Sequence, residues 1–201
     1  RHTVSHGDWS SDVCSSDLYV SATDLEVQTS FGLVTAHVSF GGAFYASVAI
    51  DDLNVTATAD QVDDLIALDR EVRAVLGDHP SCYHSDDDRL SGLYGSILHE
   101  TLGGDPLHQR NVTVFADGQV DRSPCGSGTS ARLALLHHLG MVNVGQAFQN
   151  RGVAGGEFTG RVVATTGDTV TTTIEGSAYR HATSTFHLDP HDPLGSGFLF
   201  R

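Results

Sequence analysis

The sequence predicts an α+β fold, in which one β-rich domain is wrapped around a central helix. Short runs of β-branched and aromatic residues alternate with polar residues, which is typical of half-buried strands. The chain contains 22 glycines, many of them at the ends of such runs, where turns are expected. Two stretches, residues 58–77 and 121–140, have the apolar spacing of helices, and they are the two principal helices that we expect.

The first strands are expected between Leu25 and Ile50. Leu25–Thr29 alternates apolar and polar residues, and Phe31-Gly32 interrupts the pattern. Leu33–Phe40 continues it with β-branched and aromatic residues, and Gly41-Gly42 is a hairpin signal before Ala43–Ile50. The segment therefore predicts consecutive antiparallel strands.

The first helix is predicted from a capping box at Thr58–Gln61, with Thr58 or Asp60 as N-cap, to Gly77 as C-cap. Helical spacing joins its apolar residues, which are Val62, Leu65, Ile66, Val72, Val75 and Leu76. An acidic, solvent-facing side is expected from Asp63, Asp64, Asp69 and Glu71.

Residues 78–90 are polar and acidic, and they include His79, Cys82 and His84. The spacing of these three residues matches no standard Cys/His metal site. The segment is therefore predicted to be a mobile acidic loop, and no metal site is expected in the chain.

The second half of the chain is predicted to be strands and turns around one helix. The expected strands are Leu93–Leu98 and Val112–Phe115, a hairpin over Glu157–Ile174, a further strand Thr183–Leu188 and a last one at Phe198–Phe200. Asp117-Gly118 predicts a turn immediately before the cysteine-containing stretch.

The second helix follows Cys125 and is apolar on nearly all sides, which predicts that it lies buried at the centre of the domain. Either Ser127 or Thr129 is expected as its N-cap, and Gly140 is expected to end it. His137 and His138 lie in its last turn, where a cationic ring suits the helix dipole.

The start of this helix combines a thiol with groups that attract anions. Backbone N–H groups and the dipole favour a carboxylate or phosphate, and glycines permit close approach. A helix N-terminus is also expected to lower the pKa of the Cys125 thiol, which would suit a nucleophile or a general acid/base. Asp121 could bind an ammonium group or raise the thiol pKa by repulsion. A zwitterionic amino acid fits the three groups; the alternative is an inert, buried Cys125.

Composition excludes several classes of partner. The net charge is −14, and all eleven basic residues are arginine, so a nucleic-acid partner is not expected. The acidity suits a high-salt cytoplasm, whereas a GC-rich genome would explain the missing lysines. No apolar run reaches the length of a membrane span, about 20 residues. The three cysteines, Cys14, Cys82 and Cys125, favour a reducing compartment and thus the cytoplasm.

Residues 1–18 are unlike the remainder of the chain. Asp8–Leu18 can be back-translated into a common sequencing-adapter strand, and Arg1–Thr3 fits the adapter sequence upstream. We therefore expect residues 1–18 to be a disordered, adapter-derived artefact, the alternative being a genuine serine-rich leader. The true upstream residues are then expected to be missing.

Asp121–Ala131 resembles the second active-site motif of the proline racemase family, which includes 4-hydroxyproline 2-epimerase and trans-3-hydroxyproline dehydratase. Further segments agree with this resemblance, namely Phe40–Ala46, Arg110–Gly118, Phe158–Arg161, Gly176–Tyr179 and Asp192–Arg201. The resemblance implies a diaminopimelate-epimerase-like fold of two α/β domains with the active site between them. It assigns 19–185 to the second domain and 186–201 to a strand that returns to the first.

The resemblance also implies a mechanism without cofactor, in which two cysteines exchange protons at the α-carbon. It places the second catalytic cysteine at Cys125 and the substrate-amine carboxylate at Asp121. The substrate carboxylate would meet Gly126 and Ser127, and the pocket-wall aromatics would be Phe115 together with Phe44 or Tyr45. The dehydratase branch typically carries threonine at position 125, which favours a racemase or epimerase. Family members are often dimers, so a homodimer is expected of the intact enzyme.

The family's first motif, Met-Cys-Gly-His, does not occur in the sequence. Cys82 is no substitute, because it lies in a polar segment without that motif. The chain is therefore expected to be an inactive fragment of a proline or hydroxyproline epimerase. Three alternatives stay open: a dehydratase of the same family, a hydrolase or transferase with Cys125 as nucleophile, and a non-catalytic amino-acid-binding module.

Overall fold

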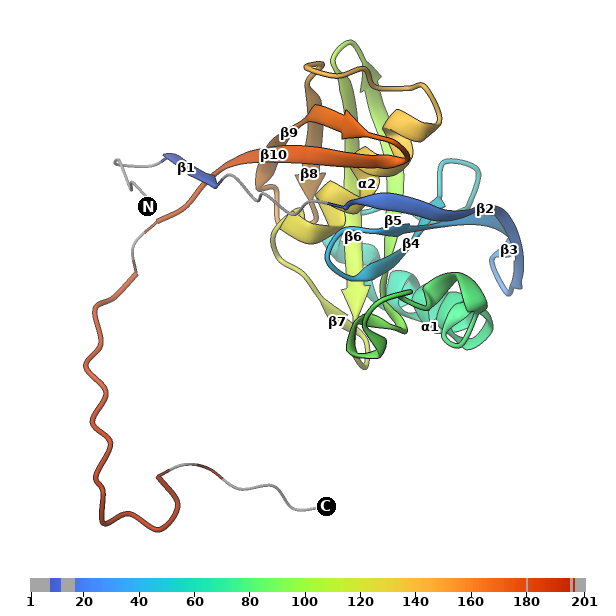
Figure 1. Ribbon diagram of the computed structural model, residues 1–201. Helices are drawn as coiled ribbons and strands as arrows, with labels where there is room; N and C mark the ends of the chain where they lie inside the picture. The colour runs from blue at the N-terminus through green and yellow to red at the C-terminus, as the bar shows by residue number, and fades with distance from the viewer. Residues whose placement is uncertain (1–7, 12–16, 180, 196, 198–201) are drawn as a thin grey trace.

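A computed structural model describes residues 8–11, 17–179, 181–195 and 197 of the 201-residue chain. Its centre is a curved ten-stranded sheet in the order β1-β10-β9-β8-β6-β5-β4-β3-β2, with β7 paired to β6. Neighbouring strands are antiparallel except for the parallel pairs β4–β5 and β6–β8. The helix α2 lies inside the curve and contacts strands from both halves of the sheet, while α1 lies outside it (Figure 1). The predicted α+β fold around a central helix is confirmed.

The first three long strands follow the predicted hairpin pattern. They are β2 (Tyr19–Thr29), β3 (Gly32–Phe40) and β4 (Phe44–Ala49), each antiparallel to the next. The turn between β3 and β4 passes against α2 at Gly41. A Cβ atom added to Gly41 would lie 2.8 Å from the Ala131 Cβ and would collide with the Ser127 carbonyl. Glycine is therefore required where the hairpin meets the central helix.

Helix α1 (Val62–Leu76) is amphipathic and packs its apolar side on the outer face of the sheet. Thr58 is the N-cap of a short 3-10 turn, Ala59–Gln61, which runs directly into α1, but its side chain makes no capping hydrogen bond; the N-cap of α1 itself is Gln61. Gly77 is the C-cap, as predicted. Asp69 was expected to face solvent but is 1% exposed, because it lies on the side of α1 that meets β5, and burial raises the pKa of its carboxyl.

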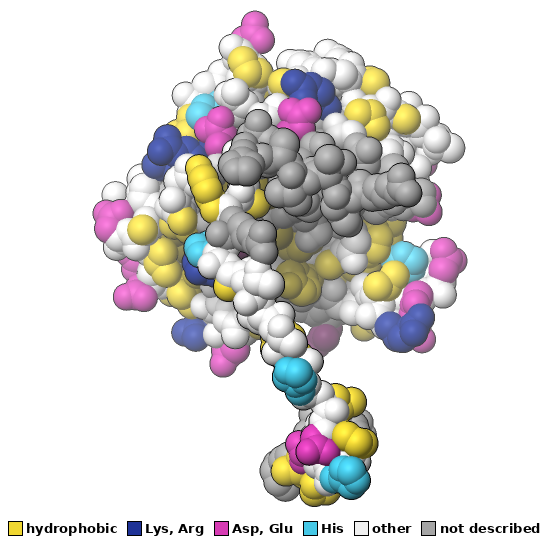
Figure 2. All heavy atoms as spheres, turned by 90° about the vertical axis from the view of Figure 1, so that its left-hand side faces the viewer, with side chains coloured by type: hydrophobic (Ala, Val, Ile, Leu, Met, Phe, Trp, Pro, Cys, Tyr) yellow, Lys and Arg dark blue, Asp and Glu magenta, His cyan; other side chains and the backbone are white. Residues whose placement is uncertain are grey.

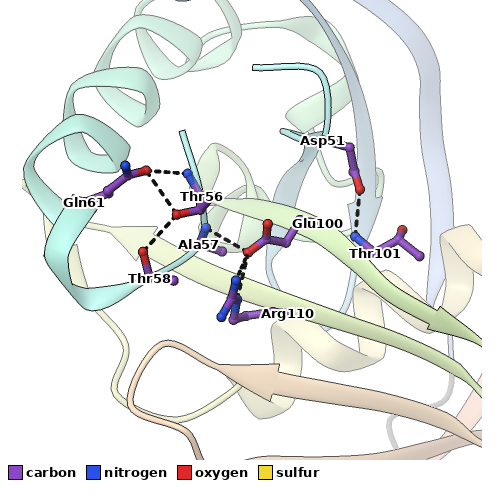
Figure 3. Close-up of polar contacts among 8 residues, drawn as sticks. All are labelled: Asp51, Thr56, Ala57, Thr58, Gln61, Glu100, Thr101 and Arg110. Atoms are coloured by element: carbon purple, nitrogen blue, oxygen red, sulfur yellow. Dashed lines mark hydrogen bonds and ion pairs between the residues drawn. The ribbon is translucent and has the colours of Figure 1, made fainter. Parts of the chain in front are cut away.

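The connection from β4 to α1 is tied to the sheet by polar contacts (Figure 3). Glu100 accepts the Ala57 N–H at 3.0 Å and pairs with Arg110 through the guanidinium Nε at 2.7 Å. Asp51 accepts the Thr101 N–H at 2.9 Å. Arg110 lies in a segment that carries the family resemblance, and its place here is structural.

The middle of the sheet is formed by β5 (Leu93–Gly104), β6 (Leu107–Phe115) and the short β7 (Gln119–Val120). The first two are longer than predicted, since their polar far ends still pair with each other. The turn at Gly118 has a positive φ of 79°, in agreement with the predicted Asp117-Gly118 turn.

The central helix α2 spans Gly126–His138, and every residue from Gly128 to Leu136 is buried. Its N-cap is Cys125, so the prediction of Ser127 or Thr129 is wrong: the helix begins two to four residues earlier than predicted, and the cysteine sulfur accepts the Gly128 N–H. The helix ends before Gly140, whose φ is 70°. Complete burial explains why its sequence is apolar on nearly all sides.

The last strands are β8 (Phe148–Gly152), β9 (Glu157–Thr166) and β10 (Thr169–Ser177), and the last two form the predicted hairpin. The predicted strand at Thr183–Leu188 is wrong. That segment leaves the domain after β10 (Figure 1), is not assigned to a strand, and is exposed throughout, with Phe186 92% exposed. The predicted strand at Phe198–Phe200 lies outside the described residues.

The N-terminal segment differs in part from the expected disorder. Strand β1 (Asp8–Ser11) pairs with β10, and Leu18 is fully buried, its carbonyl accepting the Val170 N–H at 2.8 Å. Residues 1–7 and 12–16, which include Cys14, lie outside the described residues.

On the surface, the arginine side chains of the face shown in Figure 2 lie singly among acidic ones. Neither α1 nor α2, the two α-helices of the described residues, combines the length and apolar character needed to cross a membrane.

Candidate functional site

The thiol of Cys125 lies at the start of α2, where several hydrogen-bonding groups meet. Its sulfur accepts the Gly128 N–H at 3.4 Å. The hydroxyl oxygens of Tyr45 and Ser127 lie 3.7 Å and 3.9 Å from the sulfur and 2.7 Å from each other. A backbone N–H and two hydroxyls therefore face the thiol, from β4 on one side and from the first turn of α2 on the other.

Burial decides the protonation of this thiol. Cys125 is 7% exposed, and the loss of water raises its pKa above the ordinary value. The Gly128 N–H and the Tyr45 and Ser127 hydroxyls act in the opposite direction, whereas the Asp121 charge raises the pKa further. The helix N-terminus does act to lower this pKa through the Gly128 N–H, but the expected net shift toward neutrality is wrong, because desolvation outweighs the helix donors.

Asp121 is joined to the cysteine through a short chain of hydrogen bonds. Its Oδ1 accepts the Ser123 N–H and the Ser123 hydroxyl, each at 2.9 Å. The Ser123 Oγ in turn accepts the Cys125 N–H at 3.0 Å. The carboxylate thus orders the turn before the cysteine and lies on the same loop as the thiol.

Gly126 and Ser127 form the open side of the site. Gly126 is half-buried, Ser127 is exposed, and a Cβ atom added to Gly126 would meet nothing within 4 Å. Backbone N–H groups in the first turn of a helix have no acceptor within the helix, and they attract anions. This side of the site can therefore receive a carboxylate.

The aromatic candidates separate into two groups. Tyr45 packs with Cys125 in one buried cluster, together with Ile97 and Ala131. Phe44, the residue before it on β4, points to the other face of the sheet, where the centroid of its ring lies 5.0 Å from that of Phe40. Because side chains alternate along a strand, only one of the two can face the thiol, and it is Tyr45.

Tyr94 joins Tyr45 to Phe115, and sequence reasoning missed it. The rings of Tyr94 and Phe115 are stacked at 5.7 Å, and the rings of Tyr94 and Tyr45 lie 5.5 Å apart. Between β4 and β5 the register shifts from Phe44–Leu93 to Tyr45–Gly95, so Tyr94 is an extra residue in a β-bulge. The only signal in the sequence is the Tyr94-Gly95 pair within a strand, since glycine there often marks a bulge.

Two buried asparagines behind the cysteine loop were also missed. Asn111 on β6 and Asn150 on β8 are 2% and 1% exposed, and they bond to each other at 2.7 Å. For Asn111, the sequence signal that could have indicated it is the alternation along β6, where the polar residues Gln109, Asn111 and Thr113 are the buried ones. Buried amides need specific partners, and here the amide hydrogens of both residues have them, whereas the Asn111 Oδ1 has no hydrogen-bond partner among the described residues.

Other candidate sites lie elsewhere. Cys82 is buried in the core cluster beside α1, with its S–H directed at the Leu76 carbonyl at 3.6 Å. No group of three or more His, Cys, Asp or Glu side chains in the described residues is placed to hold a metal ion. A cavity of about 550 Å³ lies at the far end of α2 from Cys125, lined by Val20, Ala134, His137, His138, Thr165, Gly167, Asp168, Thr169 and Val170.

Comparison with known proteins agrees with this geometry. The family model described as proline racemase matches residues 10–199, which includes part of the segment resembling an adapter. The proline racemase of Acetoanaerobium sticklandii is 34% identical over 90% of this chain and 55% of that protein. The trans-L-3-hydroxyproline dehydratase of Bos taurus is 37% identical over 91% of this chain and 54% of that protein.

Two solved structures are also similar. A probable proline racemase from Agrobacterium radiobacter, with bound carbonate, has a TM-score of 0.77 at 28% identity, covering 92% of this chain and 55% of that one. A hydroxyproline epimerase from Agrobacterium vitis, with bound trans-4-hydroxy-L-proline, has a TM-score of 0.75 at 30% identity, covering 92% and 54%. The chain spans about half the length of these relatives. It belongs to the proline racemase family.

Proposed function

We propose that the whole protein is a cofactor-independent racemase or epimerase that acts at the α-carbon of proline or hydroxyproline. The observation that carries this proposal is the Cys125 thiol, held at the first turn of α2 by the Gly128 N–H and beside two hydroxyls, in a chain of this family. A thiol beside an anion-attracting helix start suits the removal of a proton adjacent to a carboxylate.

The proposed reaction removes one proton from the substrate α-carbon and adds another to the opposite face. In one direction a thiolate takes the α-proton as its C–H bond breaks, and the electron pair delocalises into the substrate carboxylate. A thiol on the opposite face then donates its proton to the α-carbon and becomes the thiolate. Cys125 is one of the two groups, and the raised pKa of its buried thiol makes it the proton donor in the resting state.

The residues around Cys125 take the roles that their chemistry suits. The first-turn N–H groups at Gly126 and Ser127 bind the substrate carboxylate, which stabilises the charge that develops there. Asp121 binds the ammonium group, and the aromatic rings of Tyr45, Tyr94 and Phe115 flank the pyrrolidine ring. Phe44 has no part, because it lies in the cluster on the opposite face of the sheet.

The second base is proposed to lie outside residues 1–201. The thiol partners in the described residues are Gly128, Tyr45 and Ser127, and none of them is a second cysteine. The chain alone is therefore proposed to be inactive. Extension of the reading frame upstream of Tyr19 is expected to encode a Met-Cys-Gly-His-like motif, and a complete frame without one would contradict two-thiol racemisation.

The second candidate is a dehydratase of the same family, since a relative of that name is as similar to the chain as the racemase is. The resemblance implies threonine at position 125 in that branch, whereas this chain has cysteine. A cysteine hydrolase is less well supported, because that chemistry needs a base on the thiol, and no histidine is among the partners named above. A non-catalytic binding module would bind the amino acid but would not exchange its α-proton with solvent.

The test uses the whole protein in deuterated water with L-proline, trans-4-hydroxy-L-proline and trans-3-hydroxy-L-proline as separate substrates. Proton NMR is expected to show loss of the α-proton signal and appearance of the epimer from one of the first two. Loss of water from trans-3-hydroxy-L-proline without exchange of the others would assign a dehydratase. A trapped acyl-enzyme would assign a hydrolase, and binding without exchange would leave only a binding module.

A further inference from the structure

Cys125 has a backbone conformation that residues with side chains rarely adopt. Its φ is 65° and its ψ is 112°, outside the compact left-handed region that non-glycine residues sometimes visit. Such a conformation is strained and persists only where its surroundings impose it. Some part of the molecule must therefore hold the peptide groups on both sides of this cysteine.

Three buried polar side chains contact those peptide groups. Thr129 on α2 donates its hydroxyl to the Cys125 carbonyl at 2.6 Å, and it accepts the Asn150 amide N–H at 2.9 Å. Asn111 on β6 donates to the Pro124 carbonyl at 3.2 Å and to the Asn150 carbonyl oxygen at 2.7 Å. The second Asn150 N–H also reaches the Pro124 carbonyl, at 3.5 Å. We name these three residues the 111–129–150 network.

The geometry allows only one arrangement of this network. Each asparagine uses both hydrogens of its amide group, so both amide orientations are set by their acceptors. Reversing the Asn111 amide would place two carbonyl oxygens 2.7 Å apart. Asn111, Asn150 and Thr129 are 2%, 1% and 0% exposed, so water cannot replace a lost partner without rearrangement.

The loop is also pressed against the sheet from the side of β8. A Cβ atom added to Gly152 would lie 2.8 Å from the Pro124 nitrogen and 2.9 Å from the Ser123 carbonyl carbon. Gly152 pairs with Asn111 across β6 and β8. Strand β8 therefore packs directly against the cysteine loop at Gly152, and β6 and β8 supply two of the three side chains that hold the loop.

We propose that Asn111, Thr129 and Asn150 are positioning residues for Cys125. They bond to the Pro124 and Cys125 carbonyls, and none of the bonds described above is to the thiol itself. Through those carbonyls they hold the sulfur under the Gly128 N–H and beside Tyr45 and Ser127. The inference rests on the proposed function only in naming Cys125 as the reacting group.

The test compares Thr129→Val with Thr129→Ser in the chain of residues 1–201. Valine removes the hydroxyl at nearly unchanged volume, whereas serine retains it. Alkylation of Cys125 by iodoacetamide is followed across pH by peptide mass spectrometry, and the midpoint reports the thiol pKa. Thr129→Val is expected to raise the midpoint by about one pH unit, because the thiolate loses aligned donors. Thr129→Ser is expected to restore most of the shift.

Thr172→Val is the matched control. Thr172 is 1% exposed, lies on β10 and donates its hydroxyl to Ser130 on α2 at 3.0 Å, so it is a buried threonine that bonds to the same helix at a residue outside the cysteine loop. A midpoint that moves no further in Thr129→Val than in Thr172→Val would overturn the proposal. Tyr45 and Asp121, the titratable groups that act on the thiol, are unchanged in every variant.

A second variant covers the case in which Thr129→Val does not fold, as judged by circular dichroism. Asn111→Ala leaves the Thr129–Asn150 bond in place and is expected to shift the midpoint in the same direction; an unchanged midpoint would overturn the proposal. These measurements use no substrate, so their outcome is independent of the proposed reaction. In the whole protein, Thr129→Val is further expected to lower kcat about tenfold and to change KM less than about twofold.

Discussion

Cys82 and Cys125 are both buried, at 1% and 7% exposure, and burial raises the pKa of both thiols. Their surroundings differ. Cys82 ends a short 3-10 turn after α1, belongs to the large apolar cluster on the outer face of the sheet, and directs its S–H at the Leu76 carbonyl. Cys125 caps α2 on the inner face, where the Gly128 N–H points at its sulfur.

The difference shows that burial does not by itself distinguish a reactive cysteine from a structural one. A thiolate at Cys82 would face a carbonyl oxygen and apolar side chains, which disfavour negative charge and outweigh the favourable contact with the Ser81 side chain. A thiolate at Cys125 would be met by a backbone N–H and two hydroxyls. The donors that receive the charge, and the open side at Gly126, make Cys125 the candidate for proton transfer.

The largest expected effect is that of replacing each cysteine by serine in the whole protein. Cys125→Ser should lower the rate of α-proton exchange by about 10³-fold, because general acid–base catalysis by one group contributes 10²–10⁴. Cys82→Ser should leave the exchange rate of the folded enzyme within about twofold, since it lies outside the site. Retained exchange in Cys125→Ser would remove the basis of the comparison.

A second prediction concerns the hydroxyl of Tyr45. Tyr45→Phe retains the ring and removes a group that lies 3.7 Å from the sulfur, so the thiolate loses stabilisation. The exchange rate should fall about tenfold, and the alkylation midpoint of Cys125 should rise. Tyr83→Phe, beside Cys82 and 60% exposed, is the matched control and should change neither value.

The third prediction concerns stability, to which Cys82 is expected to contribute through the apolar core. Cys82→Ala should lower the free energy of unfolding by about 1–2 kcal/mol, because it leaves a cavity in the main apolar cluster. Urea denaturation of the 1–201 chain measures this value, and an exposed alanine replacement, Val75→Ala, provides the reference. A loss no larger than the reference would show that Cys82 does not contribute to the core.

The smallest expected effect is on the pH dependence of stability. Because folding raises the pKa of both thiols, the unfolded chain loses these protons first as pH rises above about 8.5. The contribution of the two thiols to the free energy of unfolding should therefore be constant below that pH, and it should fall as the pH rises above it. Urea denaturation at pH 7 and pH 9.5 should show a smaller fall in Cys82→Ala and in Cys125→Ala than in the unaltered chain.

Local sequence signals were sufficient for much of the fold. The β2–β3–β4 region, the β9–β10 hairpin, α1 and α2 were predicted because alternation and helical spacing reflect which side of each element is buried. The predicted strand at Thr183–Leu188 failed, since β-propensity reflects the packing of a half-buried surface, and every residue of this segment is exposed.

The candidate site was predictable in part. The thiol, Asp121 and the glycine-rich helix start are close in sequence, so a motif could indicate them. Tyr94 depended on a bulge in the pairing of β4 with β5, and the choice of Tyr45 over Phe44 depended on which face of β4 meets α2. A short sequence segment encodes neither the register of β4 with β5 nor the face of β4 that packs against α2.

The sequence by itself determined that the chain carries a cysteine at a helix start in a β-rich domain. Only the tertiary structure decided the state of that cysteine. Its pKa direction depends on how completely α2 is enclosed by strands from both halves of the sheet, and its conformation depends on Asn111 and Asn150 from two different strands. Desolvation and buried hydrogen bonds are properties of the packed interior, where residues distant in sequence set the environment of one atom.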